Sequence, residues 1–193
     1  METIYFDNNA TTLMDDRVFK ILVSSLQLGL KNPASQHQLG RQSRKQLEIT
    51  RKLVEGLLGG QRQGSAEDRV VFTSGGTESN NLALQGICGA FPQRGRLIIS
   101  GIEHPSVTVV AEMLKKDGWD LQIVDTLPNG QINLGHLGSL LNDKTRLVSV
   151  MLANNETGVI QPIADIVAQC KNHGALIHSD AVQAVGKMAV DFQ

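Results

Sequence analysis

The sequence has few cysteines, almost no net charge and no long apolar run, and each of these absences excludes a class of protein. Its two cysteines in 193 residues, Cys88 and Cys170, are too few for a disulfide framework and have no metal-ligand spacing. Both lie in apolar, helix-like surroundings, so we expect buried structural thiols and no metal site. A net charge of −1 gives no electrostatic reason to expect nucleic acid or an anionic membrane as a partner.

Membrane-spanning and secreted proteins are also disfavoured by the sequence. Nowhere do about 18 apolar residues run together, so no bilayer span is predicted. The beginning, METIYFDNNATT, has an acidic residue at position 2 and lacks the apolar core of a secretory signal. A hydrophobic content of 41% is normal for a packed globular protein. These features favour a cytoplasmic protein.

Short apolar segments alternate with longer amphipathic segments along the chain. We expect strands at 69–73, 97–101, 121–124, 147–152 and 175–179, and helices at 35–58, 78–88, 105–116, 134–141 and 163–171. Strands separated by helices indicate crossover units, and the run LVSVML at 147–152 is typical of a strand covered on both faces. The sequence therefore predicts an α/β fold with a mostly parallel sheet sandwiched by helices. The first dozen residues are expected to be extended.

Polar residues follow four of the predicted strands at the point where each strand ends. In chain order they are SGGTES at 74–79, IEHP at 102–105, ANNET at 153–157, and Asp180 with Gln183. In an open α/β sheet, ligands bind outside the carboxyl ends of the strands. We therefore expect an anion-binding turn, an imidazole, an amide and a carboxylate to meet at one edge of the sheet.

Each of these features also has a purely structural interpretation. The Gly-Gly-Thr turn is a good helix start, His104 before a proline suits the first turn of a helix, and Asn154-Asn155 suits a plain turn. Asp180 either caps a short helical segment that ends at Gly186 or faces a cation, because a buried carboxylate without a partner is costly. Four separate loops that place polar groups at one edge favour a common ligand.

Pyridoxal phosphate is one ligand that uses this whole set of groups. Its phosphate matches the free amides and the hydroxyl at the Gly76-Thr77 helix start, and its pyridine nitrogen matches the carboxylate of Asp180. Gln183 follows about one helical turn later and could reach the phenolate oxygen. His104 could stack on the ring face. The residues thus predict pyridoxal phosphate as the cofactor.

Six segments also carry a resemblance to a known enzyme family. They are YFDNNATT (5–12), NPASQHQLG (32–40), VFTSGGTESNN (71–81), EHPSV (103–107), VSVMLANNETGVIQPI (148–163) and HSDAVQAVGK (178–187). At these residues the sequence resembles the cysteine desulfurases, class V members of the fold-type-I pyridoxal phosphate enzymes. The resemblance implies the large cofactor-binding domain of that fold at 15–193. Residues 1–14 would form an extended segment that lines the substrate pocket.

The resemblance implies a role for each site residue. The cofactor-binding residues would be Gly76, Thr77, His104, Asn155, Asp180 and Gln183, and the substrate-binding residues would be Asn8, Ala10, Thr11 and Asn155. His104 would also be catalytic by helping proton transfer. Asn155 would lie beside both the cofactor and the substrate carboxylate.

The activity implied by the resemblance is removal of sulfur from L-cysteine. The products are alanine and an enzyme-bound persulfide, which a sulfur-acceptor or scaffold protein receives for iron–sulfur cluster assembly or thiolation. Family members work as homodimers. Two other hypotheses stay open: a different class V activity, such as a selenocysteine lyase or an aminotransferase, and a non-catalytic fragment that acts as an interaction module.

Two catalytic parts of the family have no match in these 193 residues. The Schiff-base lysine lies in a Ser-x-His-Lys stretch beyond the segment that matches VGK, and the nucleophilic cysteine lies further on. Lys187 matches the lysine of VGK and not the Schiff-base lysine, and neither Cys88 nor Cys170 matches the nucleophile. We therefore expect the first half of an enzyme, inactive as residues 1–193 alone.

Overall fold

The computed structural model describes residues 4–60 and 68–192. The chain forms two compact units, one made of Met1–Phe72 with Val190–Gln193 and the other of Thr73–Ala189. The functional division expected from the resemblance, at residues 14 and 15, stays a prediction.

The first unit contains two helices, α1 (Asp16–Gln27) and α2 (Gln38–Leu57). Asp15 caps α1, since its Oδ1 accepts a hydrogen bond from the backbone nitrogen of Arg17 at 2.8 Å. His37 caps α2 in the same way through the backbone nitrogen of Gly40. The helix expected at 35–58 is therefore confirmed, with a later start that its cap defines. α1 was not among the expected elements.

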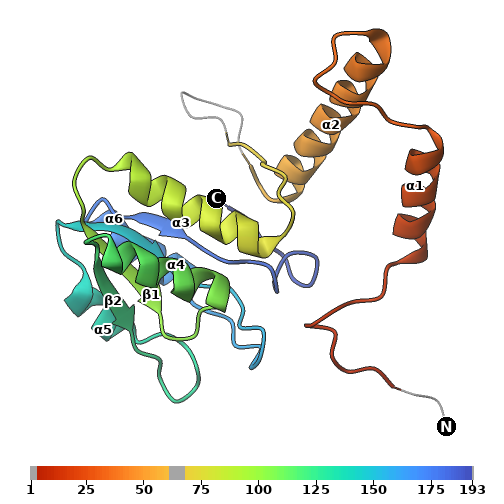
Figure 1. Ribbon diagram of the computed structural model, residues 1–193. Helices are drawn as coiled ribbons and strands as arrows, with labels where there is room; N and C mark the ends of the chain where they lie inside the picture. The colour runs from red at the N-terminus through yellow and green to blue at the C-terminus, as the bar shows by residue number, and fades with distance from the viewer. Residues whose placement is uncertain (1–3, 61–67, 193) are drawn as a thin grey trace. The chain divides into compact units, whose positions relative to one another are not determined.

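The second unit is an α/β unit with a parallel sheet (Figure 1). Its strands are β1 (Arg96–Ser100), β2 (Asp120–Val124), β3 (Thr145–Ser149) and β4 (Leu176–His178), in the order β2-β1-β3-β4. Every pair of neighbours is parallel. The helices are α3 (Gly76–Ala90), α4 (Pro105–Lys116), α5 (Leu134–Leu140) and α6 (Ile163–Lys171). The expected fold class is confirmed.

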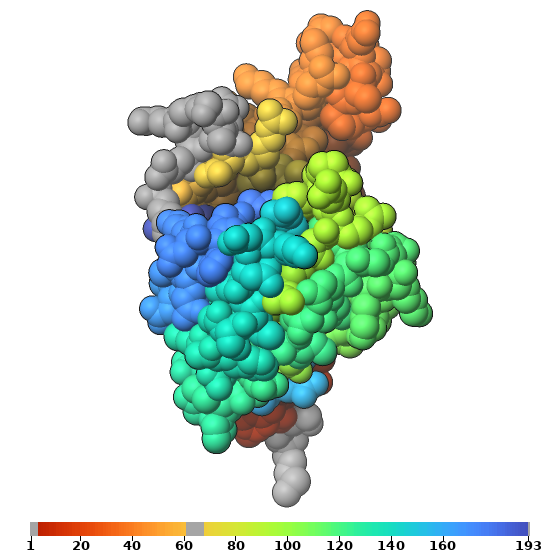
Figure 2. All heavy atoms as spheres, turned by 90° about the vertical axis from the view of Figure 1, so that its left-hand side faces the viewer, coloured from red at the N-terminus to blue at the C-terminus, as the bar shows by residue number. Residues whose placement is uncertain are grey.

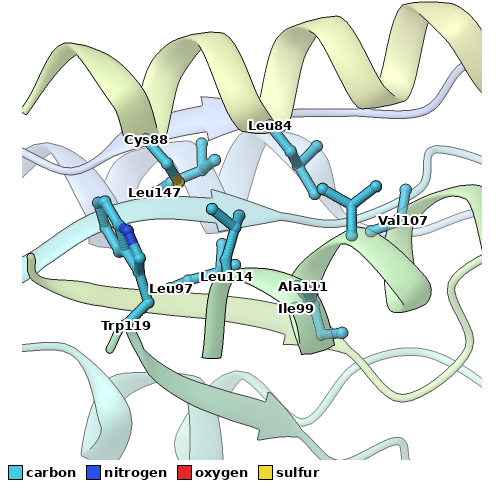
Figure 3. Packing of buried hydrophobic residues seen from close by; sticks show 10 residues of the cluster. Leu84, Cys88, Leu97, Ile99, Val107, Ala111, Leu114, Trp119 and Leu147 are labelled. Atoms are coloured by element: carbon cyan, nitrogen blue, oxygen red, sulfur yellow. The ribbon is translucent and has the colours of Figure 1, made fainter. Parts of the chain in front are cut away.

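Successive side chains of a strand point to opposite faces of the sheet, and each face has its own hydrophobic core. Leu97 and Ile99 of β1 face α3 and α4, where they pack with Leu84, Val107 and other buried residues (Figure 3). Ile98, between them, belongs to the core on the opposite face, which α5 and α6 cover. Figure 2 shows the turquoise α5 segment beside the blue α6 segment on the outside of the unit. Helices therefore sandwich the sheet, as the apolar strands predicted.

Three of the expected elements differ in the structure. Residues 69–73 form no strand, because they make no ladder with the described strands, and Val71 and Phe72 are exposed. The strand expected at 147–152 begins at Thr145 and ends at Ser149. The segment after Asp180 consists of turns and an isolated bridge between Val185 and Met188 instead of a helix, and Gly186 there has a φ of +81°, which glycine adopts without strain.

Both cysteines are buried, as expected of structural thiols. Cys88 is 1% exposed and Cys170 is 0% exposed, and burial raises the pKa of each thiol to about 11. Neither thiol is therefore activated as a nucleophile near neutral pH. In residues 4–60 and 68–192, no helix has both the length and the apolar character needed to cross a membrane.

Candidate functional site

Hydrogen bonds bring together the loops that follow β1, β3 and β4. The backbone nitrogen of Met151, after β3, donates to Glu103 Oε1, after β1, at 2.7 Å. Asn154 Nδ2 donates to the carbonyl of Ile102 at 3.2 Å. The backbone nitrogen of Leu152 donates to the carbonyl of Asp180 at 2.9 Å. The polar residues expected at the carboxyl edge of the sheet therefore do meet there.

Asp180 is the buried carboxylate of this edge, with 8% of its surface exposed. Its Oδ2 accepts a hydrogen bond from Asn80 Nδ2 at 2.7 Å, and its Oδ1 accepts from the backbone nitrogen of Val182 at 3.0 Å. The second bond caps the turn that follows, so the structural interpretation of Asp180 holds. No cation of the described chain forms an ion pair with it. Two neutral donors alone meet its charge.

The start of α3 lies against the same segment. A Cβ atom placed on Gly76 would lie 2.9 Å from Val182 Cγ2, so only glycine allows this approach without a shift. Gly75, the N-cap, supplies no side-chain hydrogen bond to the helix, and a Cβ there would meet open space. The Thr77 hydroxyl has no hydrogen-bond partner among the described residues. The helix start thus presents donors beside Asp180, and such an end favours an anion.

His104 forms the N-cap of α4 and is exposed. Its Nδ1 accepts a hydrogen bond from the backbone nitrogen of Ser106 at 3.1 Å and lies 2.7 Å from Ser106 Oγ. His104 therefore has the structural role expected of a residue at the start of a helix. It leaves the ring available for a second role, because only one ring nitrogen is used by the cap.

The two asparagines of the expected amide site have different surroundings. Asn154 is buried and shapes its own turn, since its Oδ1 accepts from the backbone nitrogens of Glu156 and Thr157 at 3.0 and 2.8 Å. Asn155 is half-buried, and its contact with cofactor and substrate stays a prediction. Gln183 is also half-buried, and its Oε1 accepts a hydrogen bond from Lys187 Nζ at 2.5 Å.

Glu103 is a buried carboxyl group that the sequence pattern did not single out as a site residue. Its Oε1 accepts hydrogen bonds from Ser100 Oγ at 2.5 Å and from the backbone of Met151, while its buried Oε2 has no partner among the described residues. Burial raises its pKa to about 7, and the charge of Asp180 acts in the same direction. Its position directly before His104, in a loop at the sheet edge, was the available signal.

The expected substrate-binding residues Asn8, Ala10 and Thr11 are exposed and belong to the first compact unit. The structure describes the two units separately, so the role of these residues stays a prediction.

Comparison with known families identifies the chain. The family model described as Aminotransferase class-V matches residues 4–193. The chain belongs to the aminotransferase class-V family. Pyridoxal phosphate is the cofactor of this family, in agreement with the cofactor that the sequence predicts.

Relatives within the aminotransferase class-V family carry a consistent description. The chain is 41% identical over 192 residues to "Putative cysteine desulfurase IscS 1" of Bacillus subtilis (strain 168), with 99% of this chain and 49% of the relative covered. It is 36% identical to "Cysteine desulfurase NifS" of Azotobacter vinelandii, with 100% and 47% covered. The chain spans about half the length of the curated relatives it matches.

Solved structures agree with this family assignment. A chain described as "NIFS-LIKE PROTEIN" superposes with a TM-score of 0.90 at 34% identity, and the match covers 98% of this chain and 51% of the other. A second, "SspA in complex with cysteine", superposes with a TM-score of 0.87 at 28% identity, covering 98% and 53%.

Glu103 should make the stability of the fold depend on pH. Its folded pKa of about 7 lies above the value of about 4.3 for an unfolded chain, so the folded protein keeps a proton that the unfolded chain releases. This stabilisation is complete below the unfolded pKa and is lost as the pH rises through about 7. Between these values the free energy of unfolding should fall by about 3 kcal/mol more in the parent chain than in Glu103→Gln, which stays neutral.

Urea unfolding of both chains across this pH range measures the difference. Glu112→Gln, at an exposed glutamate on α4, is the matched control and should keep the pH dependence of the parent. Parallel profiles for the parent and Glu103→Gln would contradict the buried, protonated carboxyl group.

Proposed function

We propose that the protein is a cysteine desulfurase and that residues 73–189 contain most of its pyridoxal phosphate site. The observation that supports this most directly is Asp180, a buried carboxylate held by two neutral donors beside a helix start without a side-chain cap. A buried charge without a cationic partner is costly. A protonated pyridine ring is such a partner.

The phosphate end of the cofactor fits the start of α3. Amide groups there carry the partial positive charge of the helix end, and the hydroxyl of Thr77 adds a further donor. Gly76 keeps the helix start close to Val182 and hence to the Asp180 segment. We assign the phosphate to Gly76 and Thr77.

The ring end of the cofactor fits the residues around Asp180. When bound, pyridoxal phosphate supplies an electron-withdrawing ring that stabilises negative charge on a substrate carbon. Asp180 would hold the proton on the ring nitrogen, and Gln183 would donate to the phenolate oxygen. His104 would lie against the ring and move a proton through the nitrogen that the α4 cap leaves unused. Asn155 would orient the ring and the substrate carboxylate.

L-cysteine is the substrate that we propose, with alanine and an enzyme-bound persulfide as products. The support is the resemblance of the six segments, the desulfurase names of the relatives, and the similarity to a structure described as a complex with cysteine. Residues 1–14, with Asn8, Ala10 and Thr11, would line the substrate pocket, and 15–193 would belong to the large domain. We extend the resemblance to a cytoplasmic homodimer that delivers sulfur to an acceptor or scaffold protein for iron–sulfur cluster assembly.

Thr77→Val tests the phosphate assignment. The substitution removes one hydroxyl donor and keeps the amides of α3, so pyridoxal phosphate should bind about 1–3 kcal/mol more weakly, the range for a hydrogen bond to a charged group. Equilibrium titration of the purified chain, followed by cofactor absorbance, gives the dissociation constants. Thr50→Val on α2 is the matched control, because its hydroxyl donates only to the carbonyl of Gln46. Equal affinity in Thr77→Val and the parent would place the phosphate elsewhere.

Residues 1–193 should bind the cofactor without catalysing desulfuration. The family's lysine and cysteine stretches do not occur in them, and Lys187 donates instead to Gln183. We expect borohydride to fix no pyridoxyl group on a specific lysine. We also expect no sulfide from L-cysteine above a free-cofactor control. Sulfide release together with a pyridoxyl group mapped to Lys187 would contradict two proposals: that Lys187 is not the Schiff-base lysine, and that residues 1–193 bind the cofactor without catalysing desulfuration.

A further inference from the structure

A row of hydrogen bonds joins Asp180 to His104 through two residues to which the family resemblance gave no role. Asn80 Nδ2 lies 2.7 Å from Asp180 Oδ2 and 2.8 Å from Ser106 Oγ. Ser106 Oγ lies 2.7 Å from His104 Nδ1. Asn80 is 4% exposed and Ser106 is 7% exposed, so water competes little for these bonds. The row connects the segment after β4, the second turn of α3 and the start of α4.

The charge of Asp180 fixes the direction of these bonds. An ionised carboxylate only accepts, so Asn80 must present its NH₂ group and not its carbonyl oxygen. One Nδ2 hydrogen goes to Asp180 and the other goes to Ser106 Oγ. Because Ser106 Oγ accepts from Asn80, its own hydrogen is directed to His104 Nδ1.

His104 Nδ1 is therefore an acceptor of two hydrogen bonds, from the hydroxyl and from the backbone nitrogen of Ser106. In the neutral imidazole one nitrogen carries the hydrogen and the other accepts. The hydrogen of His104 consequently lies on Nε2, the nitrogen that the cap does not use.

We propose that Asn80 is a positioning residue that orients the Asp180 carboxylate and, through Ser106, keeps the proton of His104 on Nε2. The proposal rests on the proposed function, in which Asp180 faces the ring nitrogen of the cofactor and His104 lies against the ring. A single buried amide then prepares both groups that handle protons in the site.

Asn80→Asp reverses the central bond of this row. Because position 80 lies 2.7 Å from Asp180 Oδ2, the two carboxyl groups share one proton, which bridges them. The oxygen at position 80 then accepts the hydrogen of Ser106 Oγ, so that oxygen no longer donates to His104 and can accept from it instead. The proportion of His104 with hydrogen on Nδ1 should rise. Asn80→Ala releases the hydroxyl of Ser106 without reversing it, and should produce a smaller change in the same direction.

Nitrogen-15 spectra of the histidine side chains in the cofactor-free chain measure this proportion at a fixed, slightly alkaline pH. In the parent chain the Nδ1 resonance of His104 should be that of an unprotonated nitrogen. It should move toward the protonated position in Asn80→Ala and further in Asn80→Asp. Asn81→Ala is the matched control, because among the residues that the structure describes the neighbouring amide donates only to the carbonyls of Thr77 and Ser106. A change in packing alone would not follow this order.

Cofactor affinity provides the second measurement. Asn80→Ala should weaken the binding of pyridoxal phosphate by roughly tenfold, since Asp180 loses a charge-assisted hydrogen bond, while Asn81→Ala should not. An unchanged Nδ1 resonance in a folded Asn80→Asp chain overturns the proposal. If Asn80→Asp does not fold, Asn80→Ala decides, because the proposal requires that the released hydroxyl of Ser106 moves the same resonance.

The row of hydrogen bonds and the proposed function can be contradicted separately. A parent chain that does not bind pyridoxal phosphate, but whose Nδ1 resonance moves in Asn80→Asp, supports the row of hydrogen bonds and overturns the proposed function. Weaker cofactor binding in Asn80→Ala with an unmoved resonance restricts Asn80 to a local contact with Asp180 and overturns the coupling to His104.

Discussion

A buried negative charge just after strand β4 is the constraint on which the site depends. Asp180 keeps 8% of its surface exposed and is met by one side-chain amide and one backbone amide. Those donors stabilise the charge only if α3 starts close by, so Asn80 has to lie in the first turns of α3 and be buried. The same approach leaves little room at Gly76, because a Cβ atom there would lie 2.9 Å from Val182 Cγ2 and the valine side chain would have to shift. An open, donor-rich helix start beside a carboxylate follows from this packing.

A second carboxyl group supports the site by remaining mostly neutral up to about pH 7. Glu103 joins the loops after β1 and β3 through Ser100 and the backbone of Met151. Because burial and the charge of Asp180 raise its pKa to about 7, this buried region avoids a second full charge in acidic solution. The loops can then be held by a carboxyl group without repelling Asp180. Glu103 thus binds the backbone of Met151, and Asp180 binds the backbone of Val182.

The sequence predicted α4 and α6 well, because each carries signals for its own boundaries. Pro105 marks the start of α4, and α6 begins at Ile163 and ends at Lys171, as expected. The apolar run at 69–73 predicted a strand that the structure lacks. A strand also needs a neighbouring strand to pair with, and the composition of a segment does not show whether one is present. The sequence signal for α1 is a cap at Asp15 followed by amphipathic spacing. Asn80 and Ser106 could not be found from strand ends, because they lie inside helices and matter only through contacts between distant segments.

The central claim is that Asp180 is held for the ring nitrogen of pyridoxal phosphate, and a binding cycle tests it most directly. The parent chain and Asp180→Asn are each titrated with pyridoxal phosphate and with its analogue in which a CH group replaces the ring nitrogen. The account predicts that the parent prefers pyridoxal phosphate by roughly tenfold or more and that Asp180→Asn loses this preference while its affinity for the analogue is unchanged. The same preference in both chains would show that Asp180 does not face the ring nitrogen.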